Sequence, residues 1–151
     1  MPTESQIKKL FWQIFERLPG EYRTTILRSY RRDELVIVTN EEKFPHPSIG
    51  YIDKAGTIAG MFYFRLSRLS DTELNEVILH ELLHLYVELR DNLKWADFQL
   101  SEALPFEAQH RVRRLRRRVE REVSKMTRRL LKALKLEDAV AQTSPENASG
   151  Q

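Results

Sequence analysis

The sequence predicts an α+β fold in a single domain, with three helical segments and a small mixed sheet of three to four strands. Three observations support this prediction. Apolar residues recur at intervals of three and four in three separate segments, which is the period of an amphipathic helix. Short runs rich in β-branched and aromatic residues lie between the first two of these segments. With 151 residues, of which 41% are hydrophobic, the chain is long enough to bury one core.

The first helix is expected over residues 4–18. Thr3 and Gln6 resemble a capping box at its start, and Pro19-Gly20 ends it. The apolar stripe consists of Ile7, Leu10, Phe11, Ile14, Phe15 and Leu18.

The predicted strands follow this helix. Residues 22–29 and 34–39 are β-prone runs separated by polar residues, which indicates a hairpin. Residues 44–47 contain two prolines, which cannot sit in a strand ladder, so they form a loop. Residues 50–53 and 57–66 complete the predicted sheet.

The second helix is expected over residues 71–90. Ser70 and Glu73 have the spacing of a capping box, Ser-x-x-Glu, immediately before an apolar run with helical period. Its apolar positions are Leu74, Val77, Ile78, Leu82, Leu85 and Leu89.

The third helix is expected over residues 101–136, with Ser101 as its cap and a kink near Pro105. Apolar residues step by three or four from Val112 to Leu134. The domain therefore covers residues 1–136. Residues 137–151 are polar, with Ser, Pro and Gly, and are expected to be disordered.

Composition excludes several classes of protein. The chain has no cysteine, so it has no disulfide, thiolate metal site or cysteine nucleophile. It has no apolar run of about 18 residues, so we expect no membrane span. No signal-peptide pattern begins the sequence, and we therefore expect a cytoplasmic location.

The charge is distributed asymmetrically. Residues 111–135 hold twelve Lys and Arg against Glu120 and Glu122, a net charge of +10, whereas the rest of the chain carries −7. One interpretation is a solvated outer face of a helix that docks on the domain or on a second copy in a homodimer. A second is contact with nucleic-acid phosphates. A third is a self-inhibitory segment over the cleft.

The sequence His80-Glu81-Leu82-Leu83-His84 is an H-E-x-x-H motif within the second helix. Residues four apart lie on one helix face, about 5–6 Å apart at Cβ, so both histidines can bind one metal ion. Zinc is the metal that this motif typically binds, and Glu81 is then the candidate base that deprotonates a water. His80, His84 and Glu81 are therefore the predicted core of a catalytic site.

A catalytic zinc needs three protein ligands and keeps one position for water. Glu88 lies one turn beyond His84 on the same helix and is better placed to contact a ligand than to be one. The downstream candidates for the third ligand are Asp91, Asp97, Glu102, Glu107 and His110.

Residues 95–104, Trp-Ala-Asp-Phe-Gln-Leu-Ser-Glu-Ala-Leu, resemble the glutamate-helix segment of the gluzincin metallopeptidases. The order of elements resembles that of the small archaeal minigluzincins. The resemblance implies a zincin-like domain with an active-site helix and a glutamate helix. It implies that Glu102, eighteen positions after His84, is the third zinc ligand. It also implies that the strand within residues 57–64 pairs with extended peptide.

Two alternatives for the third ligand stay open. Glu107, in Phe-Glu-Ala-Gln-His, resembles the Glu-Ala-[Asp/Asn] segment of other small zincins. His110 would give a three-histidine site like that of the SprT-like proteases. The residue that stabilises the oxyanion is also open among Tyr51, Tyr63 and Tyr86.

The expected function is a zinc-dependent peptidase that hydrolyses peptide bonds through a metal-activated water. Its partners would be peptides or proteins. One alternative is a nucleic-acid-associated SprT-like protease that uses residues 111–135. Another is a latent or degenerate zincin that acts as an interaction module.

Overall fold

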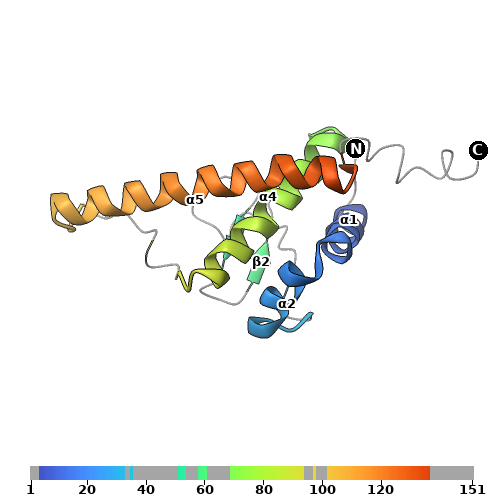
Figure 1. The fold of residues 1–151 in the computed structure, drawn as a ribbon, viewed down its shortest axis with the longest axis horizontal. Helices are drawn as coiled ribbons and strands as arrows, with labels where there is room; N and C mark the ends of the chain where they lie inside the picture. The colour runs from blue at the N-terminus through green and yellow to red at the C-terminus, as the bar shows by residue number, and fades with distance from the viewer. Residues whose placement is uncertain are drawn as a thin grey trace, which may run out of the picture.

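Helices dominate the described part of the chain. The computed structural model describes residues 4–32, 35, 51–53, 58–60, 69–93, 97 and 102–136. Their elements are α1 (Glu4–Arg17), α2 (Gly20–Ser29), β1 (Tyr51–Asp53), β2 (Ile58–Gly60), α4 (Asp71–Arg90) and α5 (Phe106–Ala133). Figure 1 shows α5 lying across α4, with α1 and α2 on the other side of α4.

The predicted α+β fold with a mixed sheet is wrong. Within the described residues the strands are β1 and β2, three residues each, paired antiparallel with Tyr51 opposite Gly60. They form a two-stranded ribbon and not a mixed sheet of three to four strands. The predicted strand at 34–39, apart from Leu35, the loop at 44–47 and the remainder of 57–66 lie outside the described residues.

The predicted strand at 22–29 is helix α2. Tyr22 and Ile26 are four residues apart and both buried, which places them on one helix face. The carbonyl of Pro19 accepts hydrogen bonds from the amides of Tyr22 and Arg23 and so begins the helix. β-Branched residues at positions 24–26 suggested a strand, but that preference is small compared with the burial of Tyr22 and Ile26.

Helix α1 agrees with its prediction. Its apolar stripe is buried except for Leu10, which is partly buried, and the next helix begins at Gly20 directly after Pro19. The guanidinium of Arg17, in its last turn, donates a hydrogen bond to the carbonyl of Leu134 just beyond α5. This contact joins the two ends of the described fold.

Helix α4 is the central element, because it contacts α1, α2, α5 and β1. It begins at a capping box: the Ser70 hydroxyl accepts from the Glu73 amide at 3.3 Å, and the Glu73 carboxylate accepts from the Ser70 amide at 3.1 Å. It ends at Arg90, and Asn92, two residues later, has a positive φ of 54°. The amide of Leu93 then bonds the carbonyl of Glu88 at 2.8 Å, as in a Schellman motif.

Most of the circumference of α4 is buried against its neighbours. One strip of α4 is only partly buried, and it contains His80, Glu81, His84 and Glu88. The buried positions are Leu74, Asn75, Ile78, Leu79, Leu82, Leu83, Leu85, Tyr86 and Val87.

Helix α5 begins at Phe106 and not at 101. Proline disfavours helical backbone in the residue before it, and Pro105 itself is extended, with φ −57° and ψ 152°. The predicted kink is therefore a helix start. The amide of Gln109 bonds the carbonyl of Pro105 at 3.0 Å in this first turn. The predicted tail at 137–151 lies outside the described residues.

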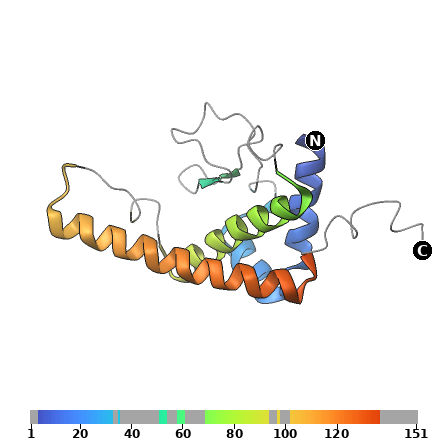
Figure 2. The same ribbon diagram turned by 90° about the horizontal axis from the view of Figure 1, so that it is seen from above.

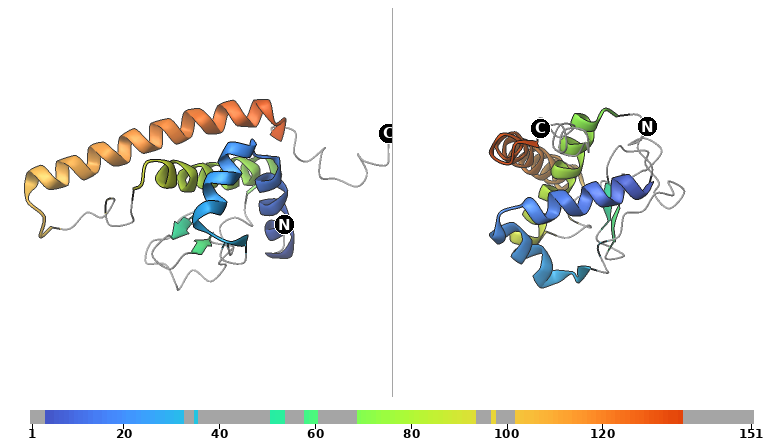
Figure 3. Two further views of the ribbon diagram at one scale, coloured as in Figure 1. Left: turned by 60° about the horizontal axis from the view of Figure 1, so that its bottom comes forward. Right: turned by 90° about the vertical axis from the view of Figure 1, so that its right-hand side faces the viewer.

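The two halves of α5 have different surroundings. Its C-terminal half packs on the body through Val119, Val123, Met126, Thr127, Leu130 and Leu131. Its N-terminal half extends beyond the end of α4, as Figures 1, 2 and 3 all show. None of the helices in the described ranges has the length and apolar character to cross a membrane.

Candidate metal centre

His80 and His84 lie one turn apart on the strip of α4 that faces α5. Their ring centroids are 4.8 Å apart. Their side chains are 23% and 20% exposed, so each ring is held by packing and still reaches the surface. The local sequence produces this geometry because the capped helix α4 is regular through the whole motif.

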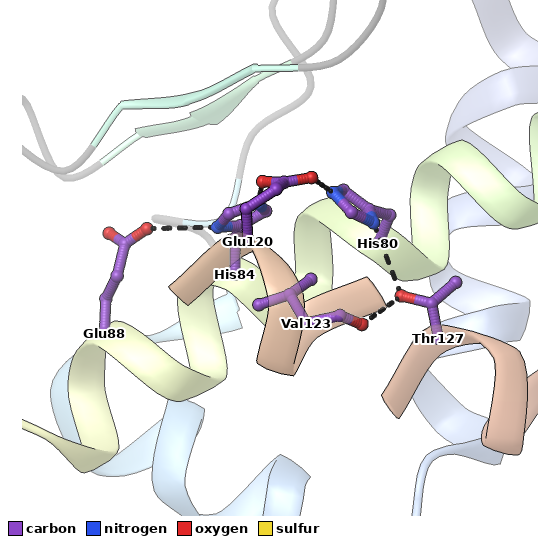
Figure 4. Close-up of polar contacts among 6 residues, drawn as sticks. All are labelled: His80, His84, Glu88, Glu120, Val123 and Thr127. Carbon is purple, nitrogen blue, oxygen red and sulfur yellow. Dashed lines mark hydrogen bonds and ion pairs between the residues drawn. The ribbon is translucent and has the colours of Figure 1, made fainter. Parts of the chain in front are cut away.

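Glu120 of α5 meets both histidines. Its Oε1 lies 2.8 Å from Nε2 of His80, and its Oε2 lies 2.8 Å from Nε2 of His84. Figure 4 shows the carboxylate between the two rings. The candidate ligand atoms of these three residues all lie within 4.8 Å of one another. Two imidazole nitrogens and one carboxylate oxygen are a donor set that catalytic zinc uses.

Each histidine is also held from its other ring nitrogen. Nδ1 of His84 lies 3.7 Å from Oε2 of Glu88, one turn further along α4. Nδ1 of His80 lies 3.4 Å from Oγ1 of Thr127 on α5. Because the Thr127 hydroxyl donates to the carbonyl of Val123 at 2.7 Å, its lone pair is available to accept from His80. Outer contacts of this kind orient metal-binding histidines.

The packing of α4 on α5 brings these groups together. His80 contacts Thr127 whereas His84, further along α4, contacts Glu120, so the two helices run antiparallel here. Glu120 and Thr127 are seven residues apart, about two helical turns, and share one face of α5. A second polar contact joins the same helices, because the Arg90 guanidinium lies 2.8 Å from Glu122.

Glu81 lies beside the two histidines in the motif and is partly buried. Burial raises the pKa of its carboxyl to about 7, and the charges of Glu120 and Glu88 act in the same direction, against that of His84. A cation held by the histidines would favour the ionised carboxylate. Glu81 therefore has the character of a carboxylate that can accept a proton near neutral pH.

The three ligand candidates influence each other's protonation. Burial opposes a charge on His84, but hydrogen bonds to Glu120 and Glu88 outweigh it and raise its pKa to about 10. Burial and the charge of His84 lower the pKa of His80. The hydrogen bond from His84 lowers the pKa of Glu120. Without metal, the cluster thus holds its proton on His84.

The predicted third ligands are not at the histidines. Glu102 lies in an exposed turn before α5, and Glu107 is exposed in its first turn. Glu107 precedes Glu120 by thirteen residues of continuous helix, which is about 20 Å along the axis. His110 stacks on Phe106, with ring centroids 6.5 Å apart, in this same remote part of α5. The structure brings Glu120 to the histidines instead, so the group that could hold a metal ion differs from the one that the gluzincin resemblance implies.

Sequence reasoning missed Glu120 because it lies inside the basic segment. One signal could have identified it. Glu120 and Glu122 are the two acidic residues among twelve Lys and Arg, and Glu120 directly follows the apolar position Val119.

Tyr86 is also excluded from the site, because it packs edge-on against Tyr22 with ring centroids 4.4 Å apart. The side chains of Tyr51 and Tyr63 lie outside the described part of the structure.

Comparisons of this chain with protein-family models, curated proteins and solved structures give no match.

Proposed function

We propose that this protein is a zinc-dependent peptidase whose metal ligands are His80, His84 and Glu120. The observation that carries the proposal is the convergence of both Nε2 atoms on one carboxylate, at 2.8 Å each, while Thr127 and Glu88 hold the two Nδ1 atoms. An H-E-x-x-H motif with its histidines oriented in this way is typical of metallopeptidases.

A zinc ion in this site would lower the pKa of a bound water to about 7 and polarise the substrate carbonyl. Glu81 accepts the proton of the attacking water. It then passes that proton to the nitrogen that leaves when the peptide bond breaks. Glu120 contributes one negative charge to the ligand set, and Thr127 and Glu88 keep the rings in place.

The decisive experiment measures zinc content and peptide cleavage in matched glutamate variants. The wild-type protein should hold about one zinc per chain. Glu120→Ala should lose zinc and activity together, whereas Glu107→Ala and Glu102→Ala, also on exposed carboxylates, should lose neither. Glu81→Gln should keep zinc and lose cleavage.

Two results would contradict this assignment. Full zinc content in a His80→Ala or Glu120→Ala protein would place the metal elsewhere. Loss of zinc in Glu102→Ala or Glu107→Ala, with Glu120→Ala unaffected, would restore the ligand set that the sequence predicts.

A second candidate function has its own observation. Residues 111–118 contain six arginines and no acidic residue, and all six are exposed. At 100° per residue they surround the helix on most sides, and Figure 3 shows the N-terminal half of α5 extending beyond the end of α4. We propose that it binds duplex nucleic acid, since a helix enters a major groove about 12 Å wide and arginines pair with its phosphates.

This proposal is tested with a fluorescent DNA duplex at several salt concentrations. With about five phosphate contacts, log K should fall with log salt with a slope of about −4 to −5. The triple variant Arg111/Arg113/Arg114→Gln should flatten the slope. The matched triple Arg128/Arg129/Lys132→Gln, with the same loss of charge on the packed half, should change it less. Equal effects of the two triples, or no binding at low salt, would remove nucleic acid as the partner.

A further inference from the structure

A cavity opens directly beside the metal centre. It has a volume of about 410 Å³ and is lined by His84, Glu88, Arg116, Arg117, Val119 and Glu120. The cavity shares His84 and Glu120 with the candidate metal site, so a ligand bound in the cavity would lie next to that site. A volume in this range is typical of ligand sites.

The charged side chains around this cavity differ in whether they have ion-pair partners. The carboxylates already have partners, because Glu120 contacts both histidines and Glu88 contacts His84. Arg117 is different: among the described residues it takes part in no ion pair. Elsewhere in the described structure, Arg90 pairs with Asp91 and Glu122. Arg117 thus lines the cavity one turn before Glu120 without an ion-pair partner among the described residues.

We infer that Arg117 binds a carboxylate of the peptide substrate and so selects acidic substrates. The inference rests on the proposed peptidase function. A guanidinium offers a planar fork of N–H donors that matches a carboxylate. A neutral side chain or an amide binds this fork less tightly than a carboxylate does. The carboxylate belongs either to an Asp or Glu side chain near the cleaved bond or to the C-terminus of the peptide. Val119 and the aliphatic stem of Arg117 cover the apolar part of the same residue.

The test measures binding in the Glu81→Gln protein, which would hold substrate without cleaving it. The probes are fluorescent peptides of one sequence with Glu or Gln at a single position, each with a free or an amidated C-terminus. Binding is recorded with and without zinc. The protein should bind the preferred carboxylate about three to ten times more tightly than its amide, because Arg117 is exposed to water. The two pairs of probes identify which carboxylate is recognised.

In the Arg117→Gln variant, the ratio of carboxylate binding to amide binding should fall to about one. Arg114→Gln is the matched control. It removes the same charge from an exposed position three residues earlier and lies outside the lining of the cavity. The ratio should survive in this control, which separates a specific contact from general attraction to a basic helix.

Three outcomes would overturn the inference: equal binding of acid and amide, no binding of any probe, or equal loss in the two arginine variants. Failure of the peptidase proposal looks different. A wild-type protein that holds zinc and cleaves nothing, yet shows the Arg117-dependent ratio, would refute the activity and keep the carboxylate site. Cleavage without the ratio would keep the activity and refute the site.

Discussion

Thr127 is the residue that best shows how single side chains prepare the metal centre. It is buried, 3% exposed, and its hydroxyl is positioned by the Val123 carbonyl before it meets Nδ1 of His80. Valine would fill the same space in the packing of α5, so packing does not explain a buried hydroxyl at this position. Its contact with Nδ1 can orient the ring of His80, whose Nε2 faces Glu120.

Thr127→Val should therefore weaken zinc binding by about tenfold, the lower end of what loss of an outer contact costs. The fold should lose only about 1–2 kcal/mol, since the hydroxyl's bond to the Val123 carbonyl and its longer contact with His80 are both removed. Competition with a zinc chelator measures the affinity, and chemical denaturation measures the stability. Thr127→Ser, which keeps the hydroxyl, should recover most of the affinity. Unchanged zinc binding in Thr127→Val would show that His80 is oriented by other groups.

Zinc binding should also release a proton from His84. The pKa of this histidine is about 10 in the metal-free protein, whereas zinc binds the neutral ring. Near pH 6.5 the water on zinc is mostly un-ionised, so His84 should release about one proton per ion. Glu81 should release part of a second, because its pKa is about 7 without metal and the cation lowers it. Affinity should rise with pH until the pKa of His84 is passed. Calorimetry in buffers of different ionisation enthalpy gives the proton number, and a value near zero would contradict the charged state of His84.

At the scale of the elements, α4 is regular through the motif because both of its ends are fixed. The capping box at Ser70 satisfies amides of the first turn, and the positive φ of Asn92 allows the closing hydrogen bonds. Asparagine tolerates this conformation better than most residues. The two histidines lie between these ends, away from the turns that fray.

Ser70→Ala should lower the free energy of unfolding by about 1 kcal/mol near neutral pH. Denaturant titration measures the change, and Ser70→Asp, which can also cap, should restore most of the stability. Zinc affinity should change little, because the cap lies ten residues before His80. A variant as stable as the wild type would mean that packing alone sets the start of α4.

The same cap predicts a dependence on pH. Two hydrogen bonds from Ser70 lower the pKa of Glu73 below its ordinary value of 4.5. The bond from the Ser70 amide has the larger effect and the bond from its hydroxyl the smaller. The ionised carboxylate therefore stabilises the fold above that value, and this contribution is lost as the pH falls through the lowered pKa. The stability difference between wild type and Glu73→Gln should shrink in acid. A difference that stays constant from neutral pH to below the pKa of Glu73 would exclude this role.

At the scale of the whole molecule, the candidate metal centre lies between two helices. Its proposed ligands come from α4 and α5, so an ion bound there would hold the C-terminal helix to the body. Zinc should therefore raise the melting temperature, with a stabilisation of about 2.7 kcal/mol at a free concentration 100 times Kd. Differential scanning calorimetry with and without a chelator measures this. Glu120→Ala should show no such rise, while Glu107→Ala should behave as wild type.

Local signals in the sequence were enough to predict α1, α4 and the H-E-x-x-H motif. Helical period, a capping box and two histidines four apart depend on neighbours within a turn or two. The error at α2 has a different origin: its β-branched residues favour a strand locally, whereas Tyr22 and Ile26 are buried by packing that the local sequence does not show, including the contact of Tyr22 with Tyr86 on α4. Glu120 was missed for the same reason, since its partner lies 36 residues away and only packing reveals it.

The origin of the third ligand has a consequence for when the protein can act. Both histidines emerge from the ribosome well before Glu120, which follows His84 by 36 residues. At about 5–20 residues per second, synthesis of that interval takes roughly two to seven seconds. During this time the growing chain has the motif and no complete site. A peptidase with the proposed ligand set would therefore be inert until α5 docks on α4.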